Sequence, residues 1–160
     1  MATTSPPGYV AMLLSEFCTT DVACCTRDTT ITEAARLMRR KHMGALVIVD
    51  DPEDEPQPVG LVTDRDIVIK VLGNELDPAT TRVGDIMSKP VVMATESEDS
   101  NVATSRMREH GIRRLPVTDS HGKLVGIVTL DDLLTGLRHT VNSLIEVVAK
   151  EQDKERRLSR

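Results

Sequence analysis

Two short stretches of the chain carry the same residue types at the same spacing. Each consists of glycine, two apolar residues, threonine, two variable residues and aspartate, at residues 60–66 and 126–132. An aspartate in the first turn of a helix can accept hydrogen bonds from both hydroxyls of a ribose, and the amides of that turn favour phosphate. The candidate ligand-binding residues are therefore Gly60, Thr63 and Asp66, together with Gly126, Thr129 and Asp132.

The same pattern also has a purely structural interpretation. Threonine followed three residues later by an acid, ahead of an apolar run, is the signature of a capped helix that needs no ligand. The glycine adds information, because glycine weakens a strand and often marks a place where a ligand or another backbone segment comes close. Its recurrence three residues upstream of the threonine in both stretches favours the binding-site interpretation.

The two stretches belong to a longer internal duplication. Residues 38–50 align with residues 107–119 at an offset of 69, and residues 59–66 align with residues 125–132 at an offset of 66. The difference falls in residues 51–58, which are rich in aspartate, glutamate and proline, as is typical of a surface loop. The repeat is longer than a solenoid unit, so the chain is predicted to contain two copies of one small domain.

Each copy has the residue pattern of a β-α-β-β-α unit. The first helix is predicted to begin with a capping box at Thr30 and Glu33 in the first copy, and with a cap at residues 99–100 in the second. A second helix is predicted to begin directly after the motif threonine. Apolar runs predict strands at residues 22–25, 45–49 and 59–62, and at 91–94, 115–118 and 124–128. Because a unit of about 60 residues is marginal alone, the copies are expected to pack sheet to sheet around a shared core.

The duplicated pattern resembles a tandem pair of cystathionine-β-synthase (CBS) domains, the Bateman module. The resemblance covers residues 18–138 and rests on the repeated Gly-x-x-Thr-x-x-Asp stretch, on Arg-Leu-Pro-Val at 114–117 and on Gly-Asp-Ile-Met at 84–87. It implies an α/β (α+β) fold of two tandem β-α-β-β-α repeats, packed as a pseudo-twofold pair with flanking N- and C-terminal helical segments. The expected division is an N-terminal segment at 1–17, repeats at 18–80 and 81–138, and a C-terminal helix with a polar tail at 139–160.

The resemblance also implies a function. Paired CBS domains bind adenosyl ligands in clefts between their repeats and regulate instead of catalysing, so a sensing module that is not an enzyme is expected. The expected ligand is AMP, ADP or ATP, with NAD or S-adenosylmethionine as further possibilities, and binding is expected to change the conformation or the dimer geometry. Asp66 and Asp132 resemble the ribose-binding acids, and Thr63 and Thr129 the neighbouring hydroxyls. The residues implied around the base, with Thr29 as a weaker candidate, are Met43, Gly44, Ala45, Ile112, Arg113, Arg114 and Pro116.

The two copies differ in charge near the predicted phosphate position. The second copy has Arg113 and Arg114 where the first has Gly44 and Ala45, whereas the motif of the first copy contains Arg65. Arginine suits bidentate contact with phosphate. Two sites of unequal affinity or phosphate preference are therefore expected, and the site of the second copy is favoured if only one is occupied.

The composition argues against several other functions. The net charge of −5 gives no general attraction to nucleic acid or to anionic lipid, and one Tyr and one Phe are too few to form a platform for stacked bases. No apolar run approaches the length of a membrane span. The glycines form neither a Gly-x-Gly fingerprint nor a phosphate-binding loop, the four histidines have no metal-ligand spacing, and no nucleophile has a recognisable partner base. A cytoplasmic location without metal, nucleic-acid or membrane contact is expected.

The cysteines and the flanking segments leave alternatives open. Cys18, Cys24 and Cys25 are interpreted as small buried residues of a reduced protein, with a redox-sensing pair involving Cys18 as the alternative. Apolar residues at 10, 13, 14 and 17 predict a short N-terminal amphipathic helix. A seam with 3-4-3-4 spacing predicts a C-terminal helix that either packs on its own domain or forms a dimer contact; it consists of Leu134, Leu137, Val141, Leu144 and Val148.

The sequence thus supports one leading hypothesis and two alternatives. The leading hypothesis is a homodimeric adenosyl-ligand sensor whose state is read by an unknown protein partner. The first alternative is a ligand-free dimeric scaffold or stress protein, and the second is a cysteine redox switch.

Overall fold

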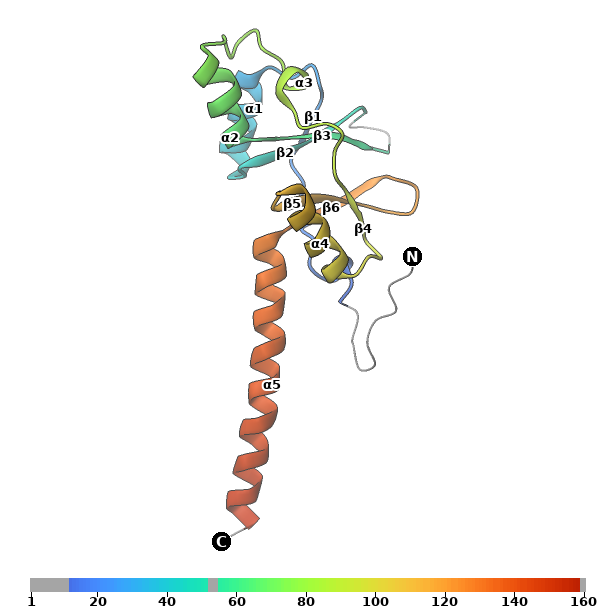
Figure 1. Cartoon of the computed structure of the whole chain (residues 1–160), viewed down its shortest axis with the longest axis vertical. Coiled ribbons are helices and arrows are strands. Elements are labelled where there is room, and N and C mark those ends of the chain that lie inside the picture. Colours follow the sequence, from blue (N-terminus) through green and yellow to red (C-terminus); the bar gives the residue numbers. More distant parts are fainter. Residues whose placement is uncertain (1–11, 52–54, 159–160) are drawn as a thin grey trace.

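The computed structural model describes residues 12–51 and 55–158, and contains two three-stranded sheets, one from each repeat. In each sheet the first strand is parallel to the second and the third is antiparallel to it. Figure 1 shows the sheets in two adjoining lobes, from which one long helix projects. The strands are β1 (Cys24–Cys25), β2 (Ala45–Val49) and β3 (Pro58–Thr63) in the first repeat, and β4 (Ala94–Thr95), β5 (Arg114–Thr118) and β6 (Leu124–Thr129) in the second. The expected mixed fold of two tandem repeats is confirmed.

The helices begin at the capping residues that the sequence predicted. Helix α1 (Ile31–Lys41) starts with the Thr30–Glu33 capping box, and α4 (Ser100–His110) starts at Asp99, whose side chain accepts from the amide of Asn101. The remaining helical segments are η1 (Leu14–Glu16), α2 (Asp64–Asp66) with its π-helical continuation η2 (Ile67–Val71) and 3₁₀ turn η3 (Leu72–Asn74), α3 (Val83–Ile86) and α5 (Leu130–Leu158).

The apolar residues form three buried clusters instead of the single shared core that was expected. One cluster lies between the sheet and helices of the first repeat, and a second occupies the same place in the second repeat. The third lies between the two sheets, where Val47 and Val49 of β2 meet Leu124 of β6. Strand β2 is buried along its whole length because it contributes to two of the clusters, whereas β3 and β6 bury only alternate residues.

Each sheet is extended by the segment that precedes the first strand of the other repeat. Thr19, ahead of β1, pairs antiparallel with Ile127 of β6, and Ser88, ahead of β4, pairs antiparallel with Leu61 of β3. Leu14 is fully buried in the cluster of the second repeat, while Met87 is buried in that of the first. The two repeats are therefore interlocked by an exchange of these segments.

The exchanged segments account for the two motif glycines. A Cβ atom on Gly60 would lie 2.4 Å from Sδ of Met87, and one on Gly126 would lie 3.0 Å from Sγ of Cys18. A side chain at either position would force Met87 or Cys18 of the crossing segment to move, so glycine permits this close approach. The close neighbour that the sequence indicated at these positions is thus another stretch of the same chain.

The N-terminal flank differs from the amphipathic helix expected there. Residue 10 lies outside the described residues, and the only helical part of the described flank is the short η1 turn. Phe17 packs against the first turns of α5, where a Cβ atom on Gly136 would lie 2.1 Å from Cε1 of its ring.

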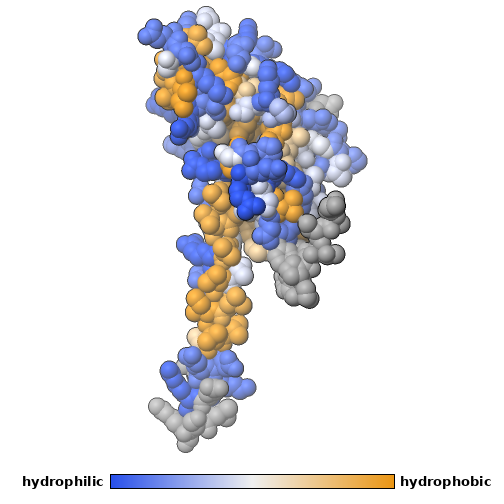
Figure 2. Space-filling view, viewed as in Figure 1, coloured by the Kyte–Doolittle hydropathy of each residue, from blue (hydrophilic) through white to orange (hydrophobic). Residues whose placement is uncertain are grey.

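The long helix α5 leaves the body of the molecule after its first turns. Leu133 is buried in the second repeat, but the apolar side chains farther along α5 are exposed, and Figure 2 shows them as one continuous apolar surface. The alternative in which the whole helix packs on its own domain is therefore wrong for its outer part. In the part of the chain that the structure describes, no helix is both long and apolar enough to cross a membrane.

We expect the exchanged N-terminal segment to be essential for the stability of the second repeat. Replacing the fully buried Leu14 by alanine should lower the free energy of unfolding by about 2–5 kcal/mol, as for other buried leucines. Its neighbour Leu13 is 39% exposed, so Leu13→Ala serves as the matched control and should cost far less. Urea unfolding of both variants measures the difference, and equal effects would contradict the placement of Leu14.

Candidate ligand-binding site

Two pockets lie between the repeats, one beside each motif aspartate. The Asp132 pocket has a volume of about 190 Å³. The Asp66 pocket is larger, at about 380 Å³. The Asp132 pocket is lined by Thr19, Val22, Ala23, Met43, Gly44, Ala45, Arg114, Ile127, Thr129 and Asp132. The Asp66 pocket is lined by Leu61, Thr63, Asp64, Arg65, Asp66, Ser88, Gly111, Ile112, Arg113 and Arg114.

Each pocket combines the motif of one repeat with the loop before the middle strand of the other. Asp132 and Thr129 face Met43, Gly44 and Ala45 of the first repeat. In the same way, the motif of the first repeat faces residues 112–114 of the second. Because each site needs both repeats, their relative position determines the shape of both pockets.

Each motif aspartate caps its own helix. Oδ2 of Asp66 accepts from the amide of Thr63 at 2.9 Å and from its hydroxyl at 2.6 Å, and the Asp66 amide donates to that hydroxyl at 3.1 Å. Asp132 and Thr129 repeat the arrangement at 2.8, 2.7 and 3.2 Å. One carboxylate oxygen of each acid is thereby committed to the cap, so a ligand hydroxyl would be accepted by the other oxygen, Oδ1.

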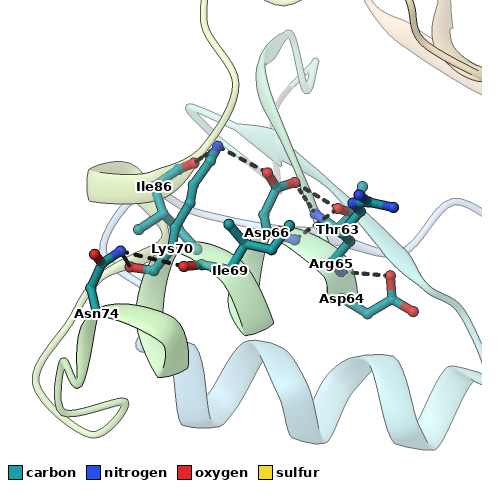
Figure 3. A network of polar contacts seen from close by, with 8 residues as sticks. All are labelled: Thr63, Asp64, Arg65, Asp66, Ile69, Lys70, Asn74 and Ile86. Carbon is teal, nitrogen blue, oxygen red and sulfur yellow. Dashed lines mark hydrogen bonds and ion pairs between the residues drawn. The ribbon is translucent and has the colours of Figure 1, made fainter.

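The environments of the two Oδ1 atoms differ. Oδ1 of Asp66 forms an ion pair with Nζ of Lys70 at 2.9 Å, and the same ammonium group donates to the Ile86 carbonyl oxygen at 2.8 Å (Figure 3). Partial burial acts to raise the pKa of Asp66, but the hydrogen bonds from Thr63 and Lys70 and the charge of Lys70 outweigh it and lower the pKa. Asp66 is therefore held as a carboxylate.

The second repeat lacks this lysine. The residue four positions after Asp132 is Gly136, which packs against Phe17. Within the described residues, Oδ1 of Asp132 has no hydrogen-bond or ion-pair partner. Asp132 is half-buried at the wall of its pocket, so this oxygen is the acceptor best placed for a ligand hydroxyl.

The arginines are distributed differently from the sequence-based expectation. Arg113 lines the pocket of Asp66 in the first repeat, not that of its own repeat, and Arg65 lines the same pocket. Arg114 borders both pockets because it lies at the start of β5, opposite Thr129 in the sheet. The second copy's site was favoured for phosphate binding because of Arg113 and Arg114. Both of these arginines line the Asp66 pocket, so that argument applies to the Asp66 pocket instead.

None of these three guanidinium groups has an ion-pair partner in the described part of the chain. Two acids line this pocket: Asp66 is neutralised by Lys70, and Asp64 supplies one further negative charge against the three guanidinium groups, so a positive excess remains. The Asp66 pocket therefore offers a positively charged surface to an anion.

Four of the predicted site residues do not line either pocket. Gly60 and Gly126 face the exchanged segments, and Pro116 is buried in β5. Thr29 lies at the turn before α1, where its hydroxyl accepts from the Thr26 amide at 3.2 Å. The remaining predicted residues divide between the two pockets.

Several lining residues were not predicted from the sequence, and two of them illustrate why. Thr19 lines the Asp132 pocket and Ser88 the Asp66 pocket, because the exchanged segments pass along these clefts. The two residues are 69 positions apart, which is the offset of the duplication. Extending the alignment upstream could have identified them as a pair, although not as residues that act in the opposite repeat.

The three cysteines are free thiols whose pKa values are raised. Burial raises the pKa of Cys24, and raises that of Cys25 to about 11. Burial also outweighs a backbone hydrogen bond at Cys18 and raises its pKa. These thiols stay protonated at neutral pH, which makes them poor redox nucleophiles. Among the described residues, no three His, Cys, Asp or Glu side chains gather in a way that could hold a metal ion.

The duplicated unit, the interlocked sheets and the paired clefts define a two-repeat α/β module. The chain belongs to the CBS domain family, whose sequence model matches residues 14–73 and 83–139. An uncharacterized protein of Methanopyrus kandleri is 38% identical over 133 residues, which are 83% of this chain and 66% of that protein. This chain therefore matches just under two thirds of that relative's length.

Two solved structures with similar folds contain adenosyl compounds. The CBS domain pair of protein MJ0100 in complex with 5′-methylthioadenosine and S-adenosylmethionine has a TM-score of 0.71 and 26% identity, covering 82% of this chain and 99% of that one. The CBS domain protein PAE2072 of Pyrobaculum aerophilum, complexed with AMP, has a TM-score of 0.68 and 26% identity, covering 76% and 90%.

The ion pair between Lys70 and Asp66 generates a prediction for pH dependence. In the Lys70→Met variant the pKa of Asp66 should rise, because the ammonium group that favours its charged form is lost. A lowered pKa stabilises the folded state above the unfolded value of about 3.8, and this stabilisation is lost as the pH falls through the folded pKa. The variant should therefore be less stable than the unmodified protein at neutral pH, and should lose less stability as the pH falls below about 3.8, because its folded and unfolded pKa values lie closer together.

Carbon-13 NMR titration of the Asp66 carboxyl group measures the shift directly. Lys70→Arg keeps the positive charge and is the matched control, for which a smaller change is expected. An unchanged pKa of Asp66 in the methionine variant would show that Lys70 does not govern this carboxylate.

Proposed function

We propose that the protein is a regulatory module, not an enzyme, that binds adenosyl ligands in the clefts between its CBS repeats. The observation that carries this proposal is the meeting, in each cleft, of a helix-capping aspartate from one repeat with the loop before the middle strand of the other. The AMP complex and the 5′-methylthioadenosine and S-adenosylmethionine complex of the two similar structures support the same class of ligand.

The Asp132 pocket suits a nucleoside. Its walls include aliphatic side chains, such as Val22, Met43 and Ile127, that can pack against the two faces of a purine. The Oδ1 atom of Asp132 is placed to accept hydrogen bonds from ribose hydroxyls, which are donors. The pocket is smaller than the roughly 300–1,000 Å³ typical of small-molecule sites, so the base and sugar fill it better than a whole nucleotide does.

The Asp66 pocket suits a phosphorylated ligand. Its volume falls within the usual range, and the guanidinium groups of Arg65, Arg113 and Arg114 are free of internal ion pairs within the described residues. Arginine binds phosphate through paired hydrogen bonds. AMP, ADP or ATP is the proposed ligand of this pocket, and ligands without phosphate are proposed to bind it less well.

Ligand binding is proposed to act on the arrangement of the repeats and on the homodimer. Each cleft has walls from both repeats, so a ligand that fits one arrangement better shifts the equilibrium towards it by its difference in affinity. Asp132 lies in the first turn of α5, and a ligand held there contacts the helix that extends out of the body. A cytoplasmic protein partner is proposed to read this change.

A ligand-free scaffold is the second candidate function, and one observation favours it. Both motif aspartates complete a capping box without any ligand, so the threonine and aspartate positions are explained by helix capping alone. Capping leaves Oδ1 of Asp132 unused. Ligand binding requires this oxygen to accept a ligand hydroxyl, whereas the scaffold function requires nothing of it.

The first test of ligand binding uses variants of the two acids. Asp132→Asn keeps an oxygen that can accept the capping hydrogen bonds from Thr129 but removes the negative charge offered to the ribose hydroxyls. Binding should therefore weaken about 10- to 100-fold at that site. Asp66→Asn should do the same at the other site. Isothermal titration calorimetry with AMP, ATP, adenosine and S-adenosylmethionine measures both effects.

The matched control is Asp131→Asn, because Asp131 is the exposed neighbour of Asp132 on the same helical turn and lines neither pocket. Its affinities should equal those of the unmodified protein. The absence of heat and of thermal stabilisation with every adenosyl compound would support the scaffold instead.

The second test concerns phosphate recognition. Arg113→Gln should reduce the affinity of the Asp66 pocket for AMP while leaving the affinity for adenosine nearly unchanged, because adenosine lacks the anionic group that arginine binds. Competition between AMP and adenosine measures the ratio of their affinities in the variant and in the unmodified protein. Arg108→Gln, an exposed arginine on α4 away from both pockets, is the control. An equal loss for both ligands would contradict a phosphate role for Arg113.

A further inference from the structure

The outer part of α5 carries an apolar face that nothing in the described structure covers. Seven side chains of the helix are between 45% and 64% exposed, and they form the apolar surface of the projecting helix in Figure 2. They are Leu134, Leu137, Val141, Leu144, Ile145, Val147 and Val148. Between residues 141 and 152 they border a shallow groove along the helix, with Ala149 and Gln152 at its edge.

The position of the helix separates this face from the rest of the protein. With 29 residues, α5 is about 43 Å long, and Figure 1 shows that it runs straight out of the second repeat. An amphipathic helix gains most of its stability from packing its apolar face against another element. Among residues 12–51 and 55–158 no element packs against this face at positions 141–152, so a surface from another molecule would complete its packing.

The spacing of the face specifies what kind of surface covers it. Successive seam residues are three and four positions apart, as in the a and d positions of a coiled coil. With Val141 and Val148 at a, and Leu137 and Leu144 at d, the outer seam has β-branched residues at a and leucine at d. This distribution favours two parallel strands.

We propose that the partner is a second copy of this chain, and that the exposed apolar face of α5, from Leu134 to Val148, pairs with the same face of that copy in a parallel two-stranded coiled coil. This proposal identifies the surface of the homodimer named above, but it does not depend on ligand binding. A face made of an apolar seam is complementary to itself, as a twofold interface requires.

The size and charge of the face fit this partner. The seven exposed side chains offer on the order of 500 Å² of apolar surface on each copy. Two copies then bury about 1,000 Å², the lower end of specific interfaces. The side chains beside the seam that would face each other in a parallel pair are uncharged, because Thr140 meets Ile145 and Val147 meets Gln152. No like charges oppose this alignment.

The first experiment measures the mass of the full chain in solution by sedimentation equilibrium. The unmodified protein is expected to be a dimer at micromolar concentration. Leu144→Glu places a charge in the middle of the seam and should raise the dimer dissociation constant at least 100-fold. Ser143→Glu adds the same charge on the neighbouring, solvent-facing position of the same helix and should leave the dimer intact.

Circular dichroism and thermal unfolding establish that both variants keep their folded repeats. A monomeric unmodified protein would overturn the proposal. So would a Leu144→Glu variant that remains dimeric, because the interface would then lie elsewhere, for example on the exposed Val68, Ile69 and Leu72 of the first repeat. A trimer or tetramer that dissociates with the same substitution would overturn the two-stranded assignment.

The second experiment tests the orientation. In a parallel pair the two copies of residue 148 face each other, so Val148→Cys should form an intermolecular disulfide rapidly under mild oxidation. In an antiparallel pair residue 148 would lie opposite the far end of the partner's seam and would not cross-link to itself. The unmodified chain and Ser143→Cys are the controls, and cross-linking no faster than in these controls would overturn the parallel arrangement.

Discussion

The close approach of two crossing segments to two glycines is the constraint on which the rest of the structure depends. Met87 lies over Gly60 and Cys18 over Gly126, at distances that leave no room for a Cβ atom without movement. This contact joins each segment to the sheet of the other repeat and makes two marginal units into one folded body. It also lines each cleft with a residue of the crossing segment, so stability and the proposed binding sites share one origin.

Much of the fold follows from local sequence patterns, because the signals are local. The Thr30–Glu33 box and Asp99 start their helices where they were expected, since an N-cap is decided by residues within one turn. The strands also follow from short apolar runs. The exchange of segments was missed because pairing of Thr19 with Ile127 joins residues more than a hundred positions apart, which no local pattern records. For the same reason the sequence predicted one shared core, where the structure has three buried clusters.

Most of the residues predicted for the candidate site do line the two pockets, but their arrangement was not predicted. The two aspartates could be identified because each motif repeats at the same topological position. The grouping of Arg113 with Asp66 could not, since it depends on how the repeats face each other. Lys70 was also missed: its effect comes from a side chain four residues along the helix, and only the structure shows that it pairs with Oδ1 of Asp66 and not with solvent. The sequence difference between Lys70 and Gly136 thus becomes a difference in whether Oδ1 of the motif aspartate is already paired, as in Asp66, or unpaired within the described residues, as in Asp132.

Helix α5 connects the two proposals physically. Its first turn contains Asp132 at the wall of one cleft, and its outer turns contain the apolar seam. A continuous helix is stiff over this length, so a small rotation at its base becomes a larger displacement at its far end. If two copies pair along the seam, the coiled coil opposes that displacement. The arrangement of the repeats and the geometry of the dimer are then coupled. A ligand that prefers one arrangement of the cleft then also prefers one dimer geometry, and by thermodynamic reciprocity dimerisation changes the affinity for that ligand by the same factor.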